Sequence, residues 1–226
     1  MKKKNTKTIL VALGTLVAFA LWTFLIRCVD VQPIGPNGSR VGFAAINGAF
    51  HALTGVHWAL YTLTDWLGLV PIGIALGFAV LGLVQLIRRK SLLKVDRDIL
   101  ILGGFYIVVL AAYLLFETVV INFRPVLIDG KLEASYPSST TMLALCILPT
   151  AMMQLKTRIR SDAVRCAILG ILAAFTVFMV VGRLISGVHW LTDIIGGVLL
   201  SVGLVMLYAF ATKRQGKSRE NFPDTV

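Results

Sequence analysis

Long runs of apolar, uncharged residues constrain the fold of this chain more than any other feature. Six such runs lie at residues 8–26, 66–87, 99–116, 138–155, 166–182 and 194–212. Each is close to the roughly 20 residues that a helix needs to cross the hydrocarbon core of a bilayer. Charged residues make up only 15% of the chain, whereas a soluble domain carries about 25%. The pattern predicts an integral membrane protein.

The same runs predict helices rather than strands. A backbone in lipid must satisfy its own hydrogen bonds, so a span is either a helix or part of a closed barrel. Strands of a membrane barrel alternate between apolar and polar residues, and these runs do not alternate. No linker rich in proline, glycine or serine divides the chain, and no internal repeat is visible. We therefore expect an all-α polytopic membrane protein, with six transmembrane helices in a single domain over residues 1–226.

The basic residues predict how these helices are oriented. Most of the 22 lysines and arginines fall in four alternate connections, namely Lys2, Lys3, Lys4 and Lys7; Arg88, Arg89, Lys90, Lys94 and Arg97; Lys156, Arg158, Arg160 and Arg165; and Lys213, Arg214, Lys217 and Arg219. Cytoplasmic loops carry an excess of basic residues, so we expect a multi-pass plasma-membrane protein with both termini in the cytoplasm. Because the net charge of +11 is spread over these connections, it does not indicate a nucleic-acid-binding face.

Two segments need a separate interpretation. The N-terminal lysines and the run at 8–26 resemble a signal peptide, but the run is too long and no small-residue cleavage site follows it closely. This favours a retained signal anchor. Residues 41–64 also lack a formal charge, yet the alternation of basic connections would be lost if they crossed the membrane. We expect this segment to lie outside as an interfacial or re-entrant element, with structural or interfacial roles for His51 and His57.

Three connections on the predicted outer side carry polar residues that suit one kind of ligand. They hold Arg124; Ser138, Ser139 and Thr140; and Arg183, His189 and Asp193. The guanidinium group of arginine is a permanently charged fork that matches phosphate oxygens. Pro137 is favourable near a helix start, where serine or threonine can cap the helix and free N–H groups attract an anion. These residues predict a phosphate-binding site.

The spacing of His189 and Asp193 predicts a nucleophile. Residues four apart on a helix share a face, so the Asp193 carboxylate is expected to hold one nitrogen of His189. The other nitrogen is then oriented and more basic, as a nucleophilic histidine requires. The cysteines Cys28, Cys146 and Cys166 have no metal-ligand spacing, and the acidic residues on the outer side are not paired at ligand spacing. We expect no metal site and no cofactor, with the cysteines as packing residues.

The segment from Arg183 to Asp193 resembles the third signature of the type 2 phosphatidic acid phosphatase (PAP2) superfamily. That signature is arginine, five residues, histidine, three residues and aspartate. Arg124 with the proline after it resembles the end of the first signature, and the segment Tyr136-Pro-Ser-Ser-Thr140 resembles the second, Pro-Ser-Gly-His. The order, spacing and membrane side of the motifs also match, and the resemblance covers most of the chain.

This resemblance implies a six-helix bundle and a metal-independent phosphatase or phosphotransferase that acts on lipid phosphates. His189 would attack phosphorus and form a phosphohistidine, and Asp193 would orient it. Arg124, Arg183 and the Ser138–Ser139 backbone would hold the phosphate oxygens and the transition-state charge. The implied partners are a lipid phosphate or polyprenyl diphosphate substrate and the surrounding membrane lipids.

Three positions depart from the family pattern, and two of them bear on the chemistry. The first signature begins with a lysine seven residues before its arginine, and this position holds Glu117. The second signature ends in a histidine that protonates the leaving group, and this position holds Thr140; Ser139 also replaces the glycine. One phosphate-binding cation and the general acid are therefore missing. A positioned acid contributes about 10²–10⁴-fold, so an alcohol leaving group would depart slowly.

Three explanations fit these departures. In the first, the substrate is a diphosphate lipid, whose leaving group is a phosphate monoester with a second pKa near about 6 and needs little protonation. In the second, Glu117 is itself the acid, because desolvation keeps its carboxyl group protonated. In the third, the site binds a lipid phosphate without turning it over, as a transporter or regulator would.

Overall fold

The computed structural model describes residues 2–221, with side chains described over residues 5–213. Its helices are α1 (Lys2–Cys28), α2 (Ala44–Thr54), α3 (Trp58–Leu67), α4 (Leu69–Arg89), α5 (Arg97–Thr118), α6 (Ser139–Arg158), α7 (Asp162–Ile185) and α8 (Leu191–Asn221), with short 3-10 helices at Pro36–Gly38 and Leu92–Lys94. Across residues 2–221 there is no β-strand, and only isolated bridges pair extended segments. The prediction of an all-α protein is confirmed.

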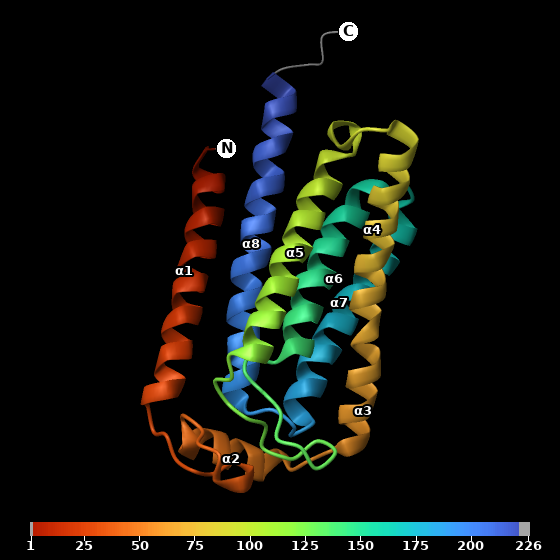
Figure 1. The fold of residues 1–226 in the computed structure, drawn as a ribbon. Helices are drawn as coiled ribbons and strands as arrows, with labels where there is room; N and C mark the ends of the chain where they lie inside the picture. Colours follow the sequence, from red (N-terminus) through yellow and green to blue (C-terminus); the bar gives the residue numbers. More distant parts are fainter. Residues whose placement is uncertain (1, 222–226) are drawn as a thin grey trace.

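The long helices α1, α4, α5, α6, α7 and α8 run along a common direction, and α2 lies across one end of them (Figure 1). The connection between α5 and α6 lies at this same end, whereas both termini lie at the other. α1 packs along α8, and α6 packs against α7, α8 and α4. The end with α2 is called the site end below, and the end with both termini the opposite end.

Five helical segments in the described part of the chain have the length and apolar composition of a membrane span. They are Asn5–Cys28, Trp58–Arg89, Arg97–Thr118, Asp162–Ile185 and Leu191–Lys213. The protein is therefore a multi-pass membrane protein, and five of the six predicted spans have a counterpart. The remaining run, 138–155, is helical as most of α6 but lacks this composition. A sixth span stays a prediction.

The polar composition of α6 follows from its place among the other helices. Its side chains Thr141, Thr150 and Gln154 are at most 4% exposed. The Thr150 hydroxyl donates to the carbonyl oxygen of Cys146 at 2.7 Å, and the Gln154 amide donates to the hydroxyl oxygen of Tyr208 at 2.5 Å. Polar side chains are common where membrane helices pack against each other and can bond there. Because its neighbours cover it, α6 does not need to present an apolar surface to lipid.

Helical structure after α2 begins earlier than the apolar run at 66–87. α3 starts at Trp58 and leads into α4 through Gly68, whose N–H donates to the carbonyl oxygens of Thr64 and Asp65. The segment predicted to lie outside, 41–64, thus contains both α2 and most of α3. Its position outside the membrane and the single-domain organisation stay predictions.

Contacts from α1 and α2 hold the first turn of α8. The indole N–H of Trp22 donates to the carbonyl oxygen of Thr192 at 3.1 Å, and the side-chain amide of Asn47 donates to the Thr192 hydroxyl at 2.9 Å. In the turn before α8, Gly187 has a φ of +72°, and a Cβ there would lie 1.8 Å from the carbonyl oxygen of Gly55. Only glycine permits this backbone and this approach. The α7–α8 turn is therefore fixed from both sides.

Candidate active site

The turn between α7 and α8 carries His189, whose residue is only 3% exposed. The Nη1 group of Arg124 lies 3.1 Å from its Nε2 atom, and the Oγ atom of Ser135 lies 3.0 Å from its Nδ1 atom. A guanidinium group can only donate hydrogen bonds, so Nε2 is the acceptor and the ring proton is on Nδ1. The Nε2 lone pair therefore points toward a cation, which is the arrangement of a histidine ready to attack an anionic ligand.

A second hydrogen bond continues from Ser135 to Asp193. The Ser135 hydroxyl donates to Asp193 Oδ2 at 2.5 Å, the N–H of Trp190 donates to the same oxygen at 2.9 Å, and the Asn122 amide donates to Oδ1 at 3.2 Å. His189 Nδ1 and Asp193 Oδ2 are themselves 3.8 Å apart. Ser135 thus joins the imidazole to a fully buried carboxylate.

The predicted proximity of His189 and Asp193 is therefore present, but the reason given for it is wrong. α8 begins at Leu191, so His189 precedes the helix and the two residues do not share a helix face. The hydrogen bond from the Trp190 N–H to the Asp193 carboxylate holds the turn next to this residue. Ser135, which makes the link, was not among the predicted site residues.

The surroundings of His189 keep it neutral. Burial, followed by the positive charges of Arg124 and Arg183, lowers the pKa of His189 well below its ordinary value of 6.5. An imidazole must be neutral to attack phosphorus, because protonation removes its lone pair. The same groups that could bind an anion thus maintain the nucleophilic form at neutral pH.

Arg183 approaches the site from the last turn of α7, with its side chain 1% exposed. Its guanidinium group donates to Asp65 Oδ1 at 3.1 Å and, at 3.3 Å each, to the Tyr61 carbonyl and the Thr64 hydroxyl. The same group lies over the Tyr61 ring, 4.8 Å from its centroid. α3 therefore supplies the partners that hold this arginine.

Arg124 has an equivalent carboxylate partner in its own connection. Its Nε atom lies 3.1 Å from Glu133 Oε2, although the N–H direction does not satisfy the geometry of a hydrogen bond. The backbone of the two residues is also paired, since the N–H of Arg124 donates to the carbonyl oxygen of Glu133 at 3.1 Å. Each arginine of the site thus lies beside one carboxylate whose side chain is roughly half exposed.

Several buried polar atoms at the site end of the molecule have no hydrogen-bond partner. Within the described side chains, such atoms are Ser39 Oγ, Arg124 Nε, Ser138 Oγ, Thr141 Oγ1 and Arg183 Nε. Buried polar groups nearly always have a partner. Three of these five atoms belong to residues that the sequence assigned to phosphate binding, and an anion with several oxygen atoms suits such donors.

The three residues at the start of α6 do not share one role. The N–H of Ser138 donates to the carbonyl oxygen of Asp193 at 3.2 Å, so this backbone group is not free for phosphate as expected. Ser139 lines the same cavity as His189. Thr140 instead directs its methyl group to the α3–α4 junction, 3.5 Å from where a Cβ of Gly68 would lie.

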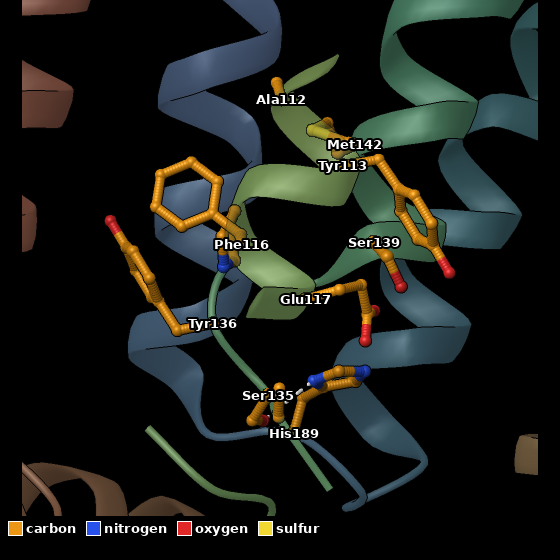
Figure 2. Close-up of a pocket in the computed structure, with 11 residues that line it drawn as sticks. Ala112, Tyr113, Phe116, Glu117, Ser135, Tyr136, Ser139, Met142 and His189 are labelled. Carbon is orange, nitrogen blue, oxygen red and sulfur yellow. Dashed lines mark hydrogen bonds between the residues drawn. The ribbon is translucent and has the colours of Figure 1, made fainter. Parts of the chain in front are cut away.

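A small cavity of about 10 Å³ lies beside His189, which is near the space that one water needs. Its polar lining consists of Tyr113, Glu117, Ser135, Tyr136, Ser139 and His189. Figure 2 shows the Glu117 side chain extending from the end of α5 between Ser139 and the His189 ring. Among the described residues, no three His, Cys, Asp or Glu side chains are grouped so that they could hold a metal ion.

Most of the residues that support the site were missed in the sequence, and one of them left a signal there. Asp65 is the one charged residue between Arg40 and Arg88, and an ionisable residue in such a stretch is a functional-site candidate by itself. Ser135, Asn122 and Glu133 offered no comparable signal.

Comparisons with known proteins give one resemblance in structure and none in sequence. No family model matches the chain, and no curated protein matches it. Among solved structures, the chain is similar to the first transmembrane PAP2 type phosphatidylglycerolphosphate phosphatase from Bacillus subtilis, at 20% sequence identity and a TM-score of 0.49, over 95% of this chain and 98% of that one. At this identity and TM-score, the similarity assigns neither a family nor an activity to this chain.

Proposed function

We propose that this protein is a PAP2-type phosphatase that removes phosphate from a lipid phosphate or lipid diphosphate through a phosphohistidine on His189. One observation carries the proposal: a buried, neutral histidine directs its Nε2 lone pair at Arg124 while Ser135 and Asp193 hold its other nitrogen. The resemblance of the three signatures leads to the same chemistry and implies that no metal is required.

In the first step, a terminal phosphate group binds to Arg124 and Arg183, and Arg124 turns from His189 Nε2 to the phosphate oxygens. Nε2 then attacks phosphorus, the bond from phosphorus to the leaving oxygen breaks, and the lipid part departs. Both arginines stabilise the charge on the transferring group, which is the largest contribution available to phosphoryl transfer.

Ser135 and Asp193 act on the intermediate rather than on phosphorus. When Nε2 carries the phosphoryl group and Nδ1 keeps its proton, the ring is cationic. The buried Asp193 carboxylate, 3.8 Å from Nδ1 and linked to it through Ser135, stabilises that charge. Attack by water then releases inorganic phosphate and restores the imidazole, whereas attack by an alcohol would transfer the phosphoryl group instead.

The site is proposed to face the outer side of the plasma membrane. Both termini lie at the opposite end of the bundle from the connection between α7 and α8 (Figure 1), and this connection carries His189. The basic clusters lie at the start of α1, between α4 and α5, between α6 and α7 and at the end of α8, which is that opposite end. Under the positive-inside rule the termini are cytoplasmic, so the site opens at the outer surface. Lipids of the outer leaflet or carriers of the cell envelope are the substrates that reach it there.

The test is to trap the intermediate in purified protein in detergent. With ³²P-labelled polyprenyl diphosphate or phosphatidic acid, we expect an acid-labile phosphohistidine and release of phosphate. His189→Ala should abolish both, a loss of at least about 10³-fold, without lowering the melting temperature enough to unfold the protein. Phosphate release by His189→Ala at the wild-type rate would refute the proposal.

A second candidate function is binding of a lipid phosphate without turnover. The observation that favours it is that Arg183 and Arg124 already lie beside the carboxylates of Asp65 and Glu133, so the site carries no excess of positive charge. Saturable binding of labelled lipid phosphate, with neither phosphohistidine nor phosphate release from any of the probes, would favour this function over the phosphatase.

A further inference from the structure

The cavity beside His189 contains few groups that can exchange a proton. Its titratable residues other than His189 are Tyr113, Glu117 and Tyr136. The Tyr136 hydroxyl lies 2.6 Å from the Thr23 hydroxyl, and the ring stacks on Phe19 with an interplanar angle of 4°. In Figure 2 this hydroxyl points away from the His189 ring. Tyr113 and Glu117 remain as groups that could act on a molecule bound next to His189.

Glu117 differs from the other carboxylates of the site end. Asp193 accepts three hydrogen bonds, and Asp65 and Glu133 each lie within 3.1 Å of an arginine nitrogen. No hydrogen bond or ion pair of the Glu117 carboxylate is found among the described residues, and its side chain is exposed at the last turn of α5. The Glu117 carboxylate therefore lines the cavity beside His189 without contributing a hydrogen bond or an ion pair to the described fold.

The size and lining of the cavity indicate which step Glu117 can serve. The cavity has room for about one water molecule, and Glu117 and His189 both line it. A carboxylate oxygen next to such a water can accept a proton from it as the water attacks phosphorus.

We propose that Glu117 is the general base that activates the water that hydrolyses the phosphohistidine; this rests on the proposed function. A carboxylate oxygen of Glu117 takes a proton from water as the water oxygen forms a bond to phosphorus. The bond between phosphorus and Nε2 breaks, inorganic phosphate leaves, and the electron pair returns to Nε2. Glu117, being exposed, then loses its proton to bulk water.

The assignment narrows the substrate class. With Glu117 assigned to the second step, Tyr113 is the cavity group left to protonate a departing alkoxide. A phenol is a weak acid, so the first step favours a leaving group that departs as an anion. A lipid diphosphate provides one, because its leaving group is a phosphate monoester that is stable as a mono- or dianion near neutral pH. A lipid monophosphate would have to expel an alkoxide.

The experiment measures both steps in one protein. Wild type, Glu117→Gln, Tyr113→Phe and Asp129→Asn are mixed in detergent with ³²P-labelled polyprenyl diphosphate, and phosphohistidine and free phosphate are followed with time. Asp129→Asn is the matched control, since it removes one exposed carboxylate from the α5–α6 connection at a positive φ that asparagine tolerates.

We expect Glu117→Gln to form phosphohistidine at least as fast as wild type, to accumulate it, and to release phosphate about 10²–10⁴-fold more slowly. Hydroxylamine, a nucleophile that attacks without prior loss of a proton, should discharge the accumulated intermediate. Asp129→Asn should behave as wild type, and Tyr113→Phe should not accumulate phosphohistidine. If Glu117 were needed only for folding, its replacement would not cause phosphohistidine to form and then accumulate.

Three results would overturn the assignment. Wild-type turnover by Glu117→Gln without accumulation removes Glu117 from the mechanism, and failure of this variant to form the intermediate places it in the first step. Accumulation in Tyr113→Phe instead assigns the base to Tyr113. In each of these cases, formation of phosphohistidine by the wild-type protein still supports the proposed phosphatase. If the wild-type protein forms no phosphohistidine, both the phosphatase and the role of Glu117 are refuted.

Discussion

The two ends of the bundle hold their arginines in different ways. At the opposite end, Arg89 pairs with Asp96 at 2.8 Å and Arg158 pairs with Asp98 at 2.7 Å, and these arginine side chains are 44% and 26% exposed. At the site end, the ion pairs of Arg124 and Arg183 are 3.1 Å long, but the arginine side chains are 9% and 1% exposed. The pairs have similar lengths and very different surroundings.

The two environments imply different energetic costs of holding an arginine. An exposed ion pair contributes between 0 and about 1 kcal/mol and loses little when it breaks. Burying a guanidinium group costs several kcal/mol unless it is fully paired, and both buried arginines keep an Nε atom without a hydrogen bond. Cations held at this cost are explained by a ligand that completes their hydrogen bonding, in accord with an anion site.

The largest expected difference in activity is between two variants that each remove one arginine, Arg124→Gln at the site end and Arg158→Gln at the opposite end. Arg124→Gln deletes a donor to the transferring phosphoryl group, and loss of one such donor costs about 10²–10³-fold in kcat. Arg158→Gln deletes a partly exposed pair and should change stability by less than about 1 kcal/mol. Phosphate release from a lipid diphosphate measures the activity of each variant, and the melting temperature in detergent measures its stability. Equal losses of activity in the two variants would remove the distinction between the ends.

A smaller effect is expected within the site end, at Ser135. Its hydroxyl is the link between His189 and the buried Asp193 carboxylate, and hydrogen bonds to charged groups contribute about 1.5–3 kcal/mol. Ser135→Ala should therefore lower kcat roughly 10–150-fold with little change in KM. Ser135→Thr, which retains the hydroxyl, should recover most of the rate. Failure of the threonine variant to recover any activity while it binds lipid normally would argue against the link.

The smallest effect should appear in the pH dependence of stability. The pKa of His189 is lowered in the folded protein, so the unfolded chain binds a proton first. Stability is therefore complete above about pH 6.5 and decreases as the pH falls toward the folded pKa. At the opposite end, the hydrogen bond from Arg89 lowers the pKa of Asp96, and this contribution is lost only below the ordinary carboxyl value of 3.8.

The contribution of His189 to the melting temperature in detergent, taken as the difference between wild type and His189→Asn, should consequently fall between about pH 7 and pH 5. His189→Asn should flatten the curve in this range, while Arg89→Gln should leave its shape unchanged. A curve that keeps its slope in His189→Asn would show that another group is responsible.

The features that could be predicted from the sequence are those set by local pattern. Each apolar run is long enough to fix a helix by itself, so the runs at 8–26, 99–116 and 166–182 lie inside α1, α5 and α7. The run at 138–155 also lies almost wholly inside a helix, α6, but its polar residues reflect neighbours far away in the sequence. Hydropathy of the run alone could not show that other helices would cover it.

Residues of the site were predictable where one connection carries a recognisable pattern, whereas the contacts between connections were not. His189 and Asp193 were found because both belong to the α7–α8 region, although a turn and not a helix brings them together. The partners of Arg183 in α3 are about 120 positions away, and the link through Ser135 crosses more than 50. Contacts of this kind depend on how the helices pack, and no spacing in the chain encodes them.

The bond from Trp22 to the Thr192 carbonyl has a consequence for how the protein is made. α1 leaves the ribosome well before α8, and Thr192, which Trp22 of α1 holds, belongs to α8. The Thr23 hydroxyl, also in α1, contacts Tyr136 of the α5–α6 connection. α1, α5 and the connection between α5 and α6 are therefore synthesised before the contacts around His189 can form. Synthesis that stops before α8 yields a chain that lacks Asp193, so the hydrogen bonds that link this carboxylate to His189 through Ser135 cannot form.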